Sequence, residues 1–279
     1  MQSKTEKTWF ITGASKGLGL SLVKQLLQKG QKVAATSRNV AQLIDAAGTD
    51  IANFLPLYAD LADDASVKEA INAAQKAFGS LDVLINNAGY GIGGSFEELT
   101  DAEIRAAFNV NVFGTINTIR HALPHMRRQQ NGHIINISSI AGFAAATGWA
   151  PYAATKFAVT GLTEVLADDV KAFGIKAVLV APGAFRTSFL TDDSLALPEN
   201  PIAAYEDIRA SHNRYRAMDG TQAGDPEKAA AVMIAAGFDE NPPVHLFLGT
   251  DAYNRALTKI DSLTKELEAN KHTSFSTDY

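Results

Sequence analysis

The sequence predicts an α/β protein, built as a doubly wound parallel sheet of about seven strands with helices on both faces. Short apolar runs alternate with helix-length segments along the 279 residues, and this alternation is typical of right-handed crossovers between parallel strands. The runs are almost continuously hydrophobic, as strands buried on both faces of a parallel sheet are. The expected strands are residues 8–11, 32–36, 54–59, 81–86, 133–138, 175–181 and 244–248.

Several helices between these strands have recognisable ends. We expect helices over residues 17–29, 64–78 and 151–173, followed by Gly30, Gly79 and Gly174 respectively. Glycine is favoured just after a helix because it readily adopts the left-handed backbone conformation. No low-complexity linker interrupts the alternation, so we expect residues 1–279 to form a single domain.

Two segments depart from the alternation. Residues 185–224 form a connection long enough to predict a substrate lid, the alternative being a surface excursion with short helices. Residues 251–279 predict a C-terminal helical extension, because Leu257, Ile260, Leu263 and Leu267 recur at helical spacing. This helix is expected to pack on the body or on a partner subunit.

Composition narrows the class of protein. The 25 basic and 30 acidic residues give a net charge of −5 without a long basic run, which argues against a nucleic-acid or membrane partner. The chain has no cysteine, so disulfides and cysteine nucleophiles are excluded and a reducing compartment is suitable. Residues 1–7 are polar and lead into the first strand without a signal peptide. We therefore expect a cytoplasmic protein.

A metal site is not predicted. His121 and His125 are four residues apart, as zinc ligands on a helix can be. Pro124 lies between them, however, and no third ligand accompanies them.

A glycine-rich loop follows the first strand and opens the first helix. Such a loop permits close backbone approach, and the helix N-terminus offers unpaired N–H groups to a pyrophosphate. The spacing of the glycines, Gly13-x-x-x-Gly17-x-Gly19, differs from the common Gly-x-Gly-x-x-Gly fingerprint. The expected dinucleotide-binding residues of this loop are Gly13, Ser15, Lys16, Gly17, Leu18 and Gly19.

The end of the second strand indicates which dinucleotide binds. Sites specific for NAD carry an acidic residue there, whereas arginine accommodates a 2′-phosphate. Here Ser37 and Arg38 occupy the position, and no carboxylate precedes Asp45. Since Lys16 adds a second cation nearby, we predict NADP(H) as the cofactor.

Tyr152 and Lys156 form a candidate acid/base pair. Four residues apart on a helix, the two side chains share one face. A lysine ammonium about 4 Å away would stabilise the phenolate and lower the phenol pKa from about 10 toward neutrality. Ser139 lies thirteen residues before Tyr152. The alternative is an ordinary amphipathic helix with a solvated lysine.

With these motifs the chain resembles the short-chain dehydrogenase/reductase family, in its shorter-core subgroup, which has a Rossmann-type fold. The resemblance rests on the glycine loop, Asn86-Asn-Ala-Gly89, Asn111, Ser139, Tyr152-x-x-x-Lys156 and Pro182-Gly183 with Thr187. It covers residues 8 to about 190 and extends to the final strand. It implies hydride transfer between a nicotinamide and a carbonyl or alcohol carbon.

The resemblance also implies roles for individual residues. Tyr152 would be the general acid or base, Lys156 would tune it and bind the nicotinamide ribose, and Ser139 would stabilise the substrate oxygen. Asn111 would anchor a water path to solvent, unless it simply satisfies buried backbone groups. Further cofactor contacts implied are Asp60, Leu61, Asn87, Ala88, Gly89, Pro182, Gly183, Phe185 and Thr187. Phe185 stands where the family usually has a branched aliphatic residue, and Asn86 to Gly89 could also hold neighbouring strands together.

The expected substrate-facing residues are mainly apolar: Phe143, Trp149 and Phe189, together with Ser139 and Tyr152, and also Ala144, Ala146, Ile92, Tyr205 and Tyr215. This lining predicts a hydrophobic ketone, aldehyde or secondary alcohol. Arg209, Arg214 and Arg216 are expected to be solvated rather than paired with an acidic substrate.

The sequence also allows two other functions. One is a catalytically silent protein that senses NADP(H) or serves as a scaffold; the other is an epimerase or dehydratase that recycles its nicotinamide. Members of the family commonly assemble through their long helices, here at about 101–130 and 151–173. A homodimer or homotetramer is therefore expected.

Overall fold

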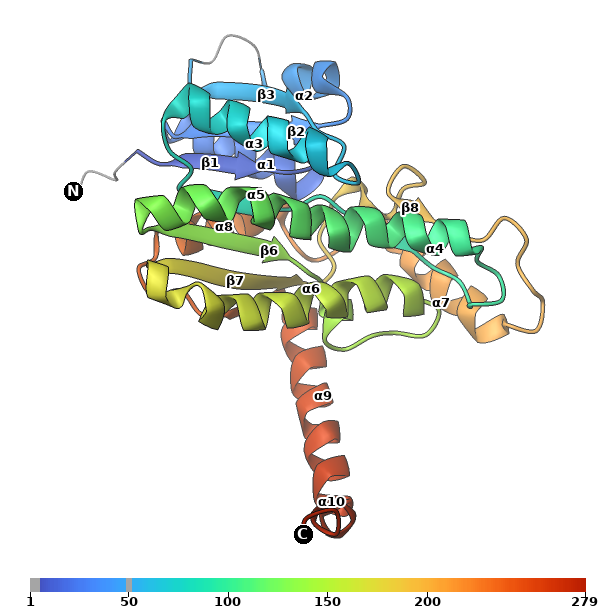
Figure 1. Cartoon of the computed structure of the whole chain (residues 1–279). Helices are drawn as coiled ribbons and strands as arrows, with labels where there is room; N and C mark the ends of the chain where they lie inside the picture. Colours follow the sequence, from blue (N-terminus) through green and yellow to red (C-terminus); the bar gives the residue numbers. More distant parts are fainter. Residues whose placement is uncertain (1–5, 49–51) are drawn as a thin grey trace.

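The computed structural model describes residues 6–48 and 52–279 and confirms the predicted fold class. Seven strands form one parallel sheet in the order β3-β2-β1-β4-β6-β7-β9 (Figure 1). The strands are β1 (Thr8–Ile11), β2 (Lys32–Ser37), β3 (Phe54–Tyr58), β4 (Val83–Asn86), β6 (Gly132–Ile137), β7 (Ile175–Pro182) and β9 (His245–Leu248). Strand order reverses between β1 and β4, and doubly wound sheets bind their ligands at such a switch point.

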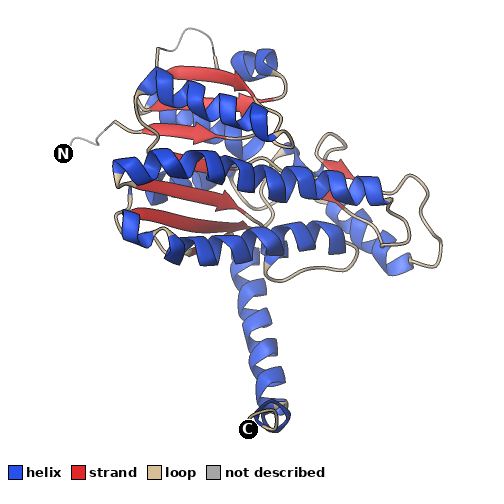
Figure 2. Cartoon of the chain, in the orientation of Figure 1, coloured by secondary structure: helices blue, strands red, loops and turns tan. Residues whose placement is uncertain are grey.

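Helices cover both faces of the sheet. They are α1 (Gly17–Gln28), α2 (Val40–Ala47), α3 (Asp64–Phe78), α4 (Asp101–Phe108), α5 (Gly114–Gln129), α6 (Ala150–Asp169) and α8 (Pro226–Phe238). Successive side chains of β1 point to opposite faces, so Trp9 joins a core with α1 and α8 while Phe10 joins a core with α3 and α5. Figure 2 shows the helical layer in front of the strands.

The three glycines predicted to follow helices have the left-handed backbone conformation expected of them. Gly30, Gly79 and Gly174 have φ angles of 70°, 82° and 68°, in the left-handed region that favours glycine. The predicted helix over 151–173 is shorter, because α6 ends at Asp169 and a separate 3-10 turn spans Lys171–Phe173. The predicted helix over 101–130 is divided by a π-helical turn at Asn109–Phe113.

Residues 185–224 form a closed excursion. Phe185 and Gly224 pair as an isolated bridge, with Arg186 N–H donating to Gly224 O at 2.9 Å and Gly224 N–H to Ala184 O at 3.0 Å. Within the excursion lie β8 (Leu195–Ala196), which pairs with β5 (Gly91–Ile92), and α7 (Glu206–Ala217).

Glu98 ties α7 to the body. Its buried carboxylate accepts hydrogen bonds from Arg209 Nη2 at 2.7 Å and from Ile202 N–H at 2.8 Å. Burial by itself would raise its pKa, but hydrogen bonds from the backbone of Ser95 and Ile202, and the charge of Arg209, bring the pKa of Glu98 down to about 2. The expectation that Arg209 is solvated is therefore wrong, because this carboxylate pairs with it.

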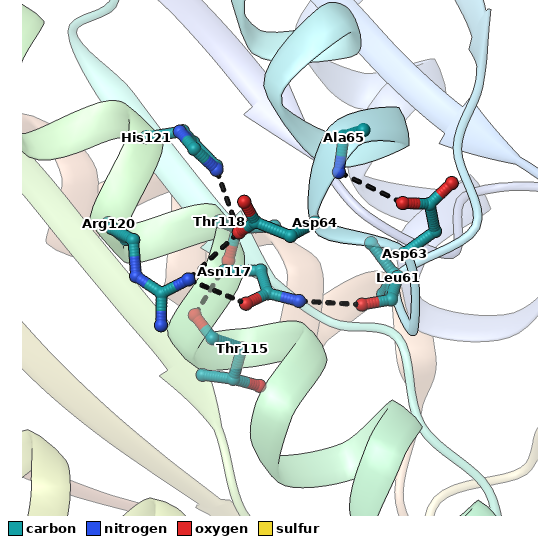
Figure 3. A network of polar contacts seen from close by, with 9 residues as sticks. All are labelled: Leu61, Asp63, Asp64, Ala65, Thr115, Asn117, Thr118, Arg120 and His121. Carbon is teal, nitrogen blue, oxygen red and sulfur yellow. Dashed lines mark hydrogen bonds and ion pairs between the residues drawn. The ribbon is translucent and has the colours of Figure 1, made fainter.

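His121 is engaged by an acidic side chain at the start of α3 (Figure 3). Asp64 Oδ1 lies 2.8 Å from His121 Nε2 and accepts from Arg120 Nη1 at 2.9 Å. Beside this contact, Asn117 Nδ2 donates to Leu61 O at 3.2 Å. The network joins α3 to α5 and holds the segment that contains Leu61.

Within the described residues, no group of three or more His, Cys, Asp or Glu side chains could hold a metal ion. In the same part of the chain, no helix is both long and apolar enough to cross a membrane. The prediction for the polar start of the chain concerns mainly residues 1–5, which lie outside the described residues.

The chain ends in α9 (Thr250–Ala269) and the short α10 (Lys271–Phe275). These two helices cover most of residues 251–279. Figures 1 and 2 show α9 leaving the body and projecting away from it.

Candidate active site

A cleft of about 1010 Å³ opens at the carboxyl ends of the strands, where the strand order reverses. Most of the predicted site residues line it together: Gly13, Ser15, Lys16, Gly17, Leu18, Ser37, Arg38, Asp60, Leu61, Asn87, Ala88, Gly89, Ser139, Trp149, Tyr152, Lys156, Pro182, Gly183, Phe185, Thr187 and Phe189. Three predicted residues, Gly19, Asn111 and Phe143, are not part of this lining.

The glycine loop is shaped by close backbone approach. Gly13 and Gly17 have φ angles of 63° and 57°, and a Cβ on Gly13 would lie 2.8 Å from Ala88 Cα. Gly19 lies behind the loop, where a Cβ would meet Asn87 Nδ2 and Gly13 O at 2.6 Å. This packing explains why Gly19 is required without lining the cleft.

The start of α1 is open to an anion. Lys16 is the N-cap residue, its side chain makes no cap hydrogen bond, and the first turn contains no acidic residue. Lys16, Gly17 and Leu18 line the cleft at this helix end. Free N–H groups and the helix dipole suit a pyrophosphate, so these residues fit the phosphate group of a dinucleotide.

Asn87 supports the loop from the neighbouring strand end. Its Nδ2 donates to Thr12 O and Gly13 O, both at 2.9 Å. Asn86 acts in a different direction, since its Nδ2 donates to Asn136 Oδ1 at 2.8 Å and joins β4 to β6. Asn86 therefore holds two neighbouring strands together, as considered for the Asn86 to Gly89 motif. Asn87 of the same motif lines the cleft.

The two predicted phosphate cations, Lys16 and Arg38, both line the cleft. Ser37 Oγ accepts from Asn39 N–H at 3.0 Å, which shapes the turn after β2. Arg38 follows Ser37 and lines the cleft, as does Lys16. Neither cation forms an ion pair or a side-chain hydrogen bond with another residue of 6–48 or 52–279.

Tyr152, Lys156 and Ser139 meet at the centre. Tyr152 and Lys156 lie on α6 and are 8% and 4% exposed. Lys156 Nζ donates to Ile137 O at 2.9 Å and lies 5.8 Å from the centroid of the Tyr152 ring. Ser139 follows the end of β6, and its Oγ accepts from Ala141 N–H at 3.1 Å.

The two adjacent serines, Ser138 and Ser139, have different contacts and therefore different roles. Ser138 Oγ donates to Lys156 O at 2.9 Å and also contacts Thr160 Oγ1 at 3.1 Å. Ser138 is thus occupied in holding α6 against β6. Ser139 is the serine hydrogen-bonded to Tyr152.

The ionisation of the pair differs from the sequence expectation. Burial raises the pKa of Tyr152 to about 12, and the hydrogen bond with Ser139 opposes this only in part. Burial also lowers the pKa of Lys156 to about 8. The expected shift toward neutrality is not found in this structure, because desolvation raises the pKa of Tyr152. The Lys156 ammonium is held at Ile137 O, 5.8 Å from the centroid of the Tyr152 ring.

Asn111 sits behind the cleft in the π-helical turn. Its Oδ1 accepts from Tyr90 N–H at 3.1 Å, and its Nδ2 donates to Tyr90 O at 3.0 Å and Thr155 Oγ1 at 3.1 Å. A Cβ on Gly89 would lie 3.1 Å from Asn111 Oδ1 and 3.4 Å from Lys156 Nζ. Asn111 therefore satisfies buried backbone groups, the alternative role that its residue type allowed, and it does so next to the lysine.

Aromatic side chains surround Tyr152 at the substrate end. The Phe189 ring lies 5.8 Å from the Tyr152 ring, and the Trp149 ring lies 5.0 Å from the Tyr215 ring. Phe143 does not face this space: its ring packs at 5.3 Å against Phe247, near the start of α9. The expectation that Phe143 faces the substrate is corrected, because the 3-10 turn after Ser139 directs it to the other side.

Two further residues of the substrate end differ from the expectation. Ile92 is fully buried in the core beneath Tyr152, and the Tyr205 hydroxyl donates to Glu97 Oε2 at 2.8 Å on an exposed edge. Ala146 and Tyr215 do line the cleft.

Several lining residues had no signal in the sequence. They include Ser188, Asp193, Met218, Gln222, Asp251 and Arg255. The Gln222 amide and the Trp149 indole N–H are buried and have no hydrogen-bond partner among the described residues. The lining residues without a sequence signal lie in the 185–224 excursion and on α9. No local sequence motif predicts where these two segments run relative to the cleft.

A dinucleotide-sized cleft with a glycine loop, a buried tyrosine, a lysine and a serine defines an oxidoreductase of the α/β nucleotide-binding class. The model of the short chain dehydrogenase family matches residues 7–196, and the chain belongs to that family. The oxidoreductase BOA17 of Botryotinia fuckeliana is 33% identical over 90% of this chain and 91% of its own. A 3-ketodihydrosphingosine reductase of Bacteroides thetaiotaomicron is 35% identical over 86% of each chain.

Solved structures agree with this assignment. A short-chain dehydrogenase from Streptomyces avermitilis superposes with a TM-score of 0.90 at 34% identity, covering 99% of this chain and 100% of its own. ElxO with NADP bound has a TM-score of 0.71 at 29% identity, covering 87% and 96%. A 3-ketoacyl-(acyl-carrier-protein) reductase from Brucella melitensis complexed with NADH has a TM-score of 0.72 at 27% identity, covering 88% and 98%.

Proposed function

We propose that this oxidoreductase uses NADP(H) to transfer a hydride between the nicotinamide and a hydrophobic ketone, aldehyde or secondary alcohol. The observation that carries the proposal is the convergence of Tyr152, Ser139 and Lys156 in one cleft with the open N-terminus of α1. ElxO holds NADP and the Brucella reductase holds NADH, which supports a nicotinamide cofactor for this chain. The preference for NADP(H) over NAD(H) is argued from this chain's own residues.

Side chains of the centre supply the proton chemistry. With its pKa raised to about 12, the Tyr152 phenol keeps its proton at neutral pH and can donate it to a carbonyl oxygen. Ser139 can donate a hydrogen bond to the same oxygen as negative charge develops there. When bound, the nicotinamide supplies or accepts the hydride. The phenol is therefore in the protonation state that carbonyl reduction requires.

Lys156 has the positioning role. Its ammonium, anchored at Ile137 O, favours transfer of the phenolic proton by lowering the energy of the resulting phenolate. Asn111, next to Lys156 across Gly89, is proposed to orient a water path that returns a proton from solvent.

The preference for NADP(H) is supported by Lys16 and Arg38. Both line the cleft, and neither is neutralised by an ion pair with another described residue. A 2′-phosphate offers the negative charge that such cations bind. Asp60 and Leu61 would contact the adenine, and Thr187 the nicotinamide carboxamide.

A hydrophobic substrate is supported by the aromatic lining around Tyr152. We propose residues 185–224 as the substrate lid of a single domain spanning the chain, because Phe189 and Tyr215 of this excursion line the cleft. The name of the Bacteroides relative, a ketone reductase, is consistent with this substrate class.

We further propose a cytoplasmic homo-oligomer. The outer sides of the π-helical turn and α6 expose Phe113, Phe157 and Val165, which are 52%, 46% and 63% accessible. Apolar side chains gathered on long helices suit contact with a second copy. The absence of cysteine suits a reducing compartment.

The proposal is tested by an NADPH-oxidation screen over carbonyl compounds of graded size and polarity. We expect turnover to rise with apolar bulk, and a Tyr152→Phe variant to lose about 10²-fold to 10⁴-fold in kcat while still binding NADPH. Better turnover of small, strongly polar carbonyls would contradict the substrate class. Binding of NADPH without turnover of any carbonyl would favour the sensing alternative.

A further inference from the structure

Helix α9 is anchored only at its start. Ala252 and Ala256 are buried, Asp251 Oδ2 accepts from Ala184 N–H at 2.8 Å, and Arg255 Nη2 donates to Ala144 O. None of residues 257–279 is buried. The rest of the helix therefore projects into solvent, as Figure 1 shows.

An apolar stripe runs along the projecting part. Tyr253, Leu257, Ile260, Leu263 and Leu267 are 58%, 49%, 49%, 39% and 69% exposed. Their spacing of three and four residues places them on one face, as in the seam between paired helices. The projecting part of α9, residues 257–269, is no longer than the roughly 12–15 residues below which an isolated helix is only marginally stable in water, so this face needs a partner.

The charges beside the stripe suit another helix better than a membrane. Lys259, Lys265 and Lys271 are balanced by Asp261, Glu266 and Glu268. A helix that lies on an anionic bilayer carries an excess of lysine and arginine on its polar face, which this segment lacks.

We propose that α9 pairs antiparallel with α9 of a second copy of this chain. A twofold axis repeats every contact: Ile260 then lies against the partner's Leu263, and Leu257 against the partner's Leu267. Lys259 and Glu266 flank the same edge of the stripe, so each Lys259 lies beside the partner's Glu266. The stripe is therefore self-complementary: its apolar side chains meet each other across the pair, and its basic residue meets its acidic residue.

The anchored start of α9 decides the orientation. Ala256 lies on the same face and is already covered by the body of its own chain, so the continuous open part of the stripe runs from Leu257 to Leu267, with Tyr253 exposed beside the anchor. Antiparallel pairing of residues 257–267 places the two bodies at opposite ends of the helix pair. Parallel pairing would bring both bodies to the same end, beside the covered Ala256.

This interface is independent of the proposed reaction and separate from the apolar side chains on α6. The first test compares Ile260→Glu/Leu263→Glu with a matched control, Thr258→Glu/Ser262→Glu, which adds the same charge to the opposite face. We expect light scattering to give half the wild-type mass for the stripe variant and the full mass for the control. Unchanged melting temperature and NADPH binding would show that the body remains folded.

The second test uses the absence of native cysteine. Residues 257 and 267 are ten positions apart, about 15 Å along a helix, so Leu257→Cys/Leu267→Cys forms an intermolecular disulfide only if the two positions meet across the pair. We expect the double variant to form a covalent dimer and each single variant to remain uncrosslinked.

Three outcomes would overturn the proposal. The wild-type protein could be a monomer, or the stripe variant could keep the wild-type mass. Cross-linking through Leu267→Cys alone would indicate a parallel pair. Binding of the wild-type protein to phosphatidylserine vesicles, lost in the stripe variant without a change in mass, would assign the face to a membrane instead.

Discussion

Lys156 and Ile137 are joined by a hydrogen bond that organises the active site: Lys156 Nζ donates to Ile137 O at 2.9 Å. Ile137 is the last residue of β6, and Ser139 follows two positions later. One strand end therefore positions both the ammonium and the serine beside Tyr152. The buried ammonium destabilises the folded protein, since burial lowers the pKa of Lys156 to about 8.

A Lys156→Met variant is expected to be more stable at pH 7 and inactive. The pKa of Lys156 in the folded state lies below the ordinary value of 10.5, so folding is opposed below about pH 8, and the penalty disappears as the pH rises toward 10.5. We expect a gain of about 1–2 kcal/mol, from ~3 kcal/mol of burial cost removed and ~1 kcal/mol of hydrogen bonding lost.

Urea unfolding of wild type and Lys156→Met at pH 7 and pH 9.5 measures this effect. The gain must shrink at the higher pH, where the wild-type lysine is largely neutral in the folded protein. An equal gain at both pH values would show that burial of the charge is not its origin.

Arg38→Asp is expected to reverse the cofactor preference. Loss of the cation and gain of a carboxylate disfavour a 2′-phosphate and favour a free 2′-hydroxyl. We expect the Kd for NADPH to rise at least about tenfold, or ~1.4 kcal/mol, and the Kd for NADH to fall. Fluorescence titration with NADPH and NADH measures both Kd values, and Lys24→Asp on the exposed side of α1 is the control. An unchanged ratio of the two Kd values in Arg38→Asp would refute the assignment of Arg38.

Asn111→Leu is expected to destabilise the fold as well as slow turnover. The substitution leaves Tyr90 N–H and Tyr90 O without their partner. Thr155 Oγ1 loses the donor Asn111 Nδ2 but keeps its own hydrogen bond to Tyr152 O. We expect a loss of about 2–4 kcal/mol, because buried polar groups left unpaired are costly. Thermal unfolding measures this loss, and Asn109→Leu, an exposed position two residues earlier, should have little effect. A normal melting temperature with slow turnover would instead support a role only in proton transfer.

Gln222→Leu is expected to stabilise the protein. The amide is buried without a partner among the residues that the structure describes, and removing such a group should raise the free energy of unfolding by about 1 kcal/mol. Gln129→Leu is the matched contrast, because its amide bonds both Leu81 N–H and Leu81 O at 3.0 Å. Denaturant unfolding should move the two variants in opposite directions; a destabilised Gln222→Leu protein would indicate a partner such as a bound water.

Much of the site could be predicted because its motifs are local. The glycine loop, the Asn86 to Gly89 turn and the Tyr152 to Lys156 spacing each lie within one turn or one helix, and their backbone geometry follows from nearby residues. Phe143 could not be placed in this way, since the rotation of the turn after Ser139 depends on packing against Phe247. Gln222 likewise reaches the cleft only because Phe185 and Gly224 close the excursion.

By itself, the sequence determined the order of strands and helices, the glycines at the helix ends and the chemistry gathered around Tyr152, because these depend on local backbone preference and hydrophobic pattern. Only the tertiary structure decided the sign of the Tyr152 pKa shift, the pairing of Glu98 with Arg209 and the direction of α9. Each of these depends on burial and on contacts between residues distant in the chain, and desolvation acts on a side chain only once the rest of the fold surrounds it.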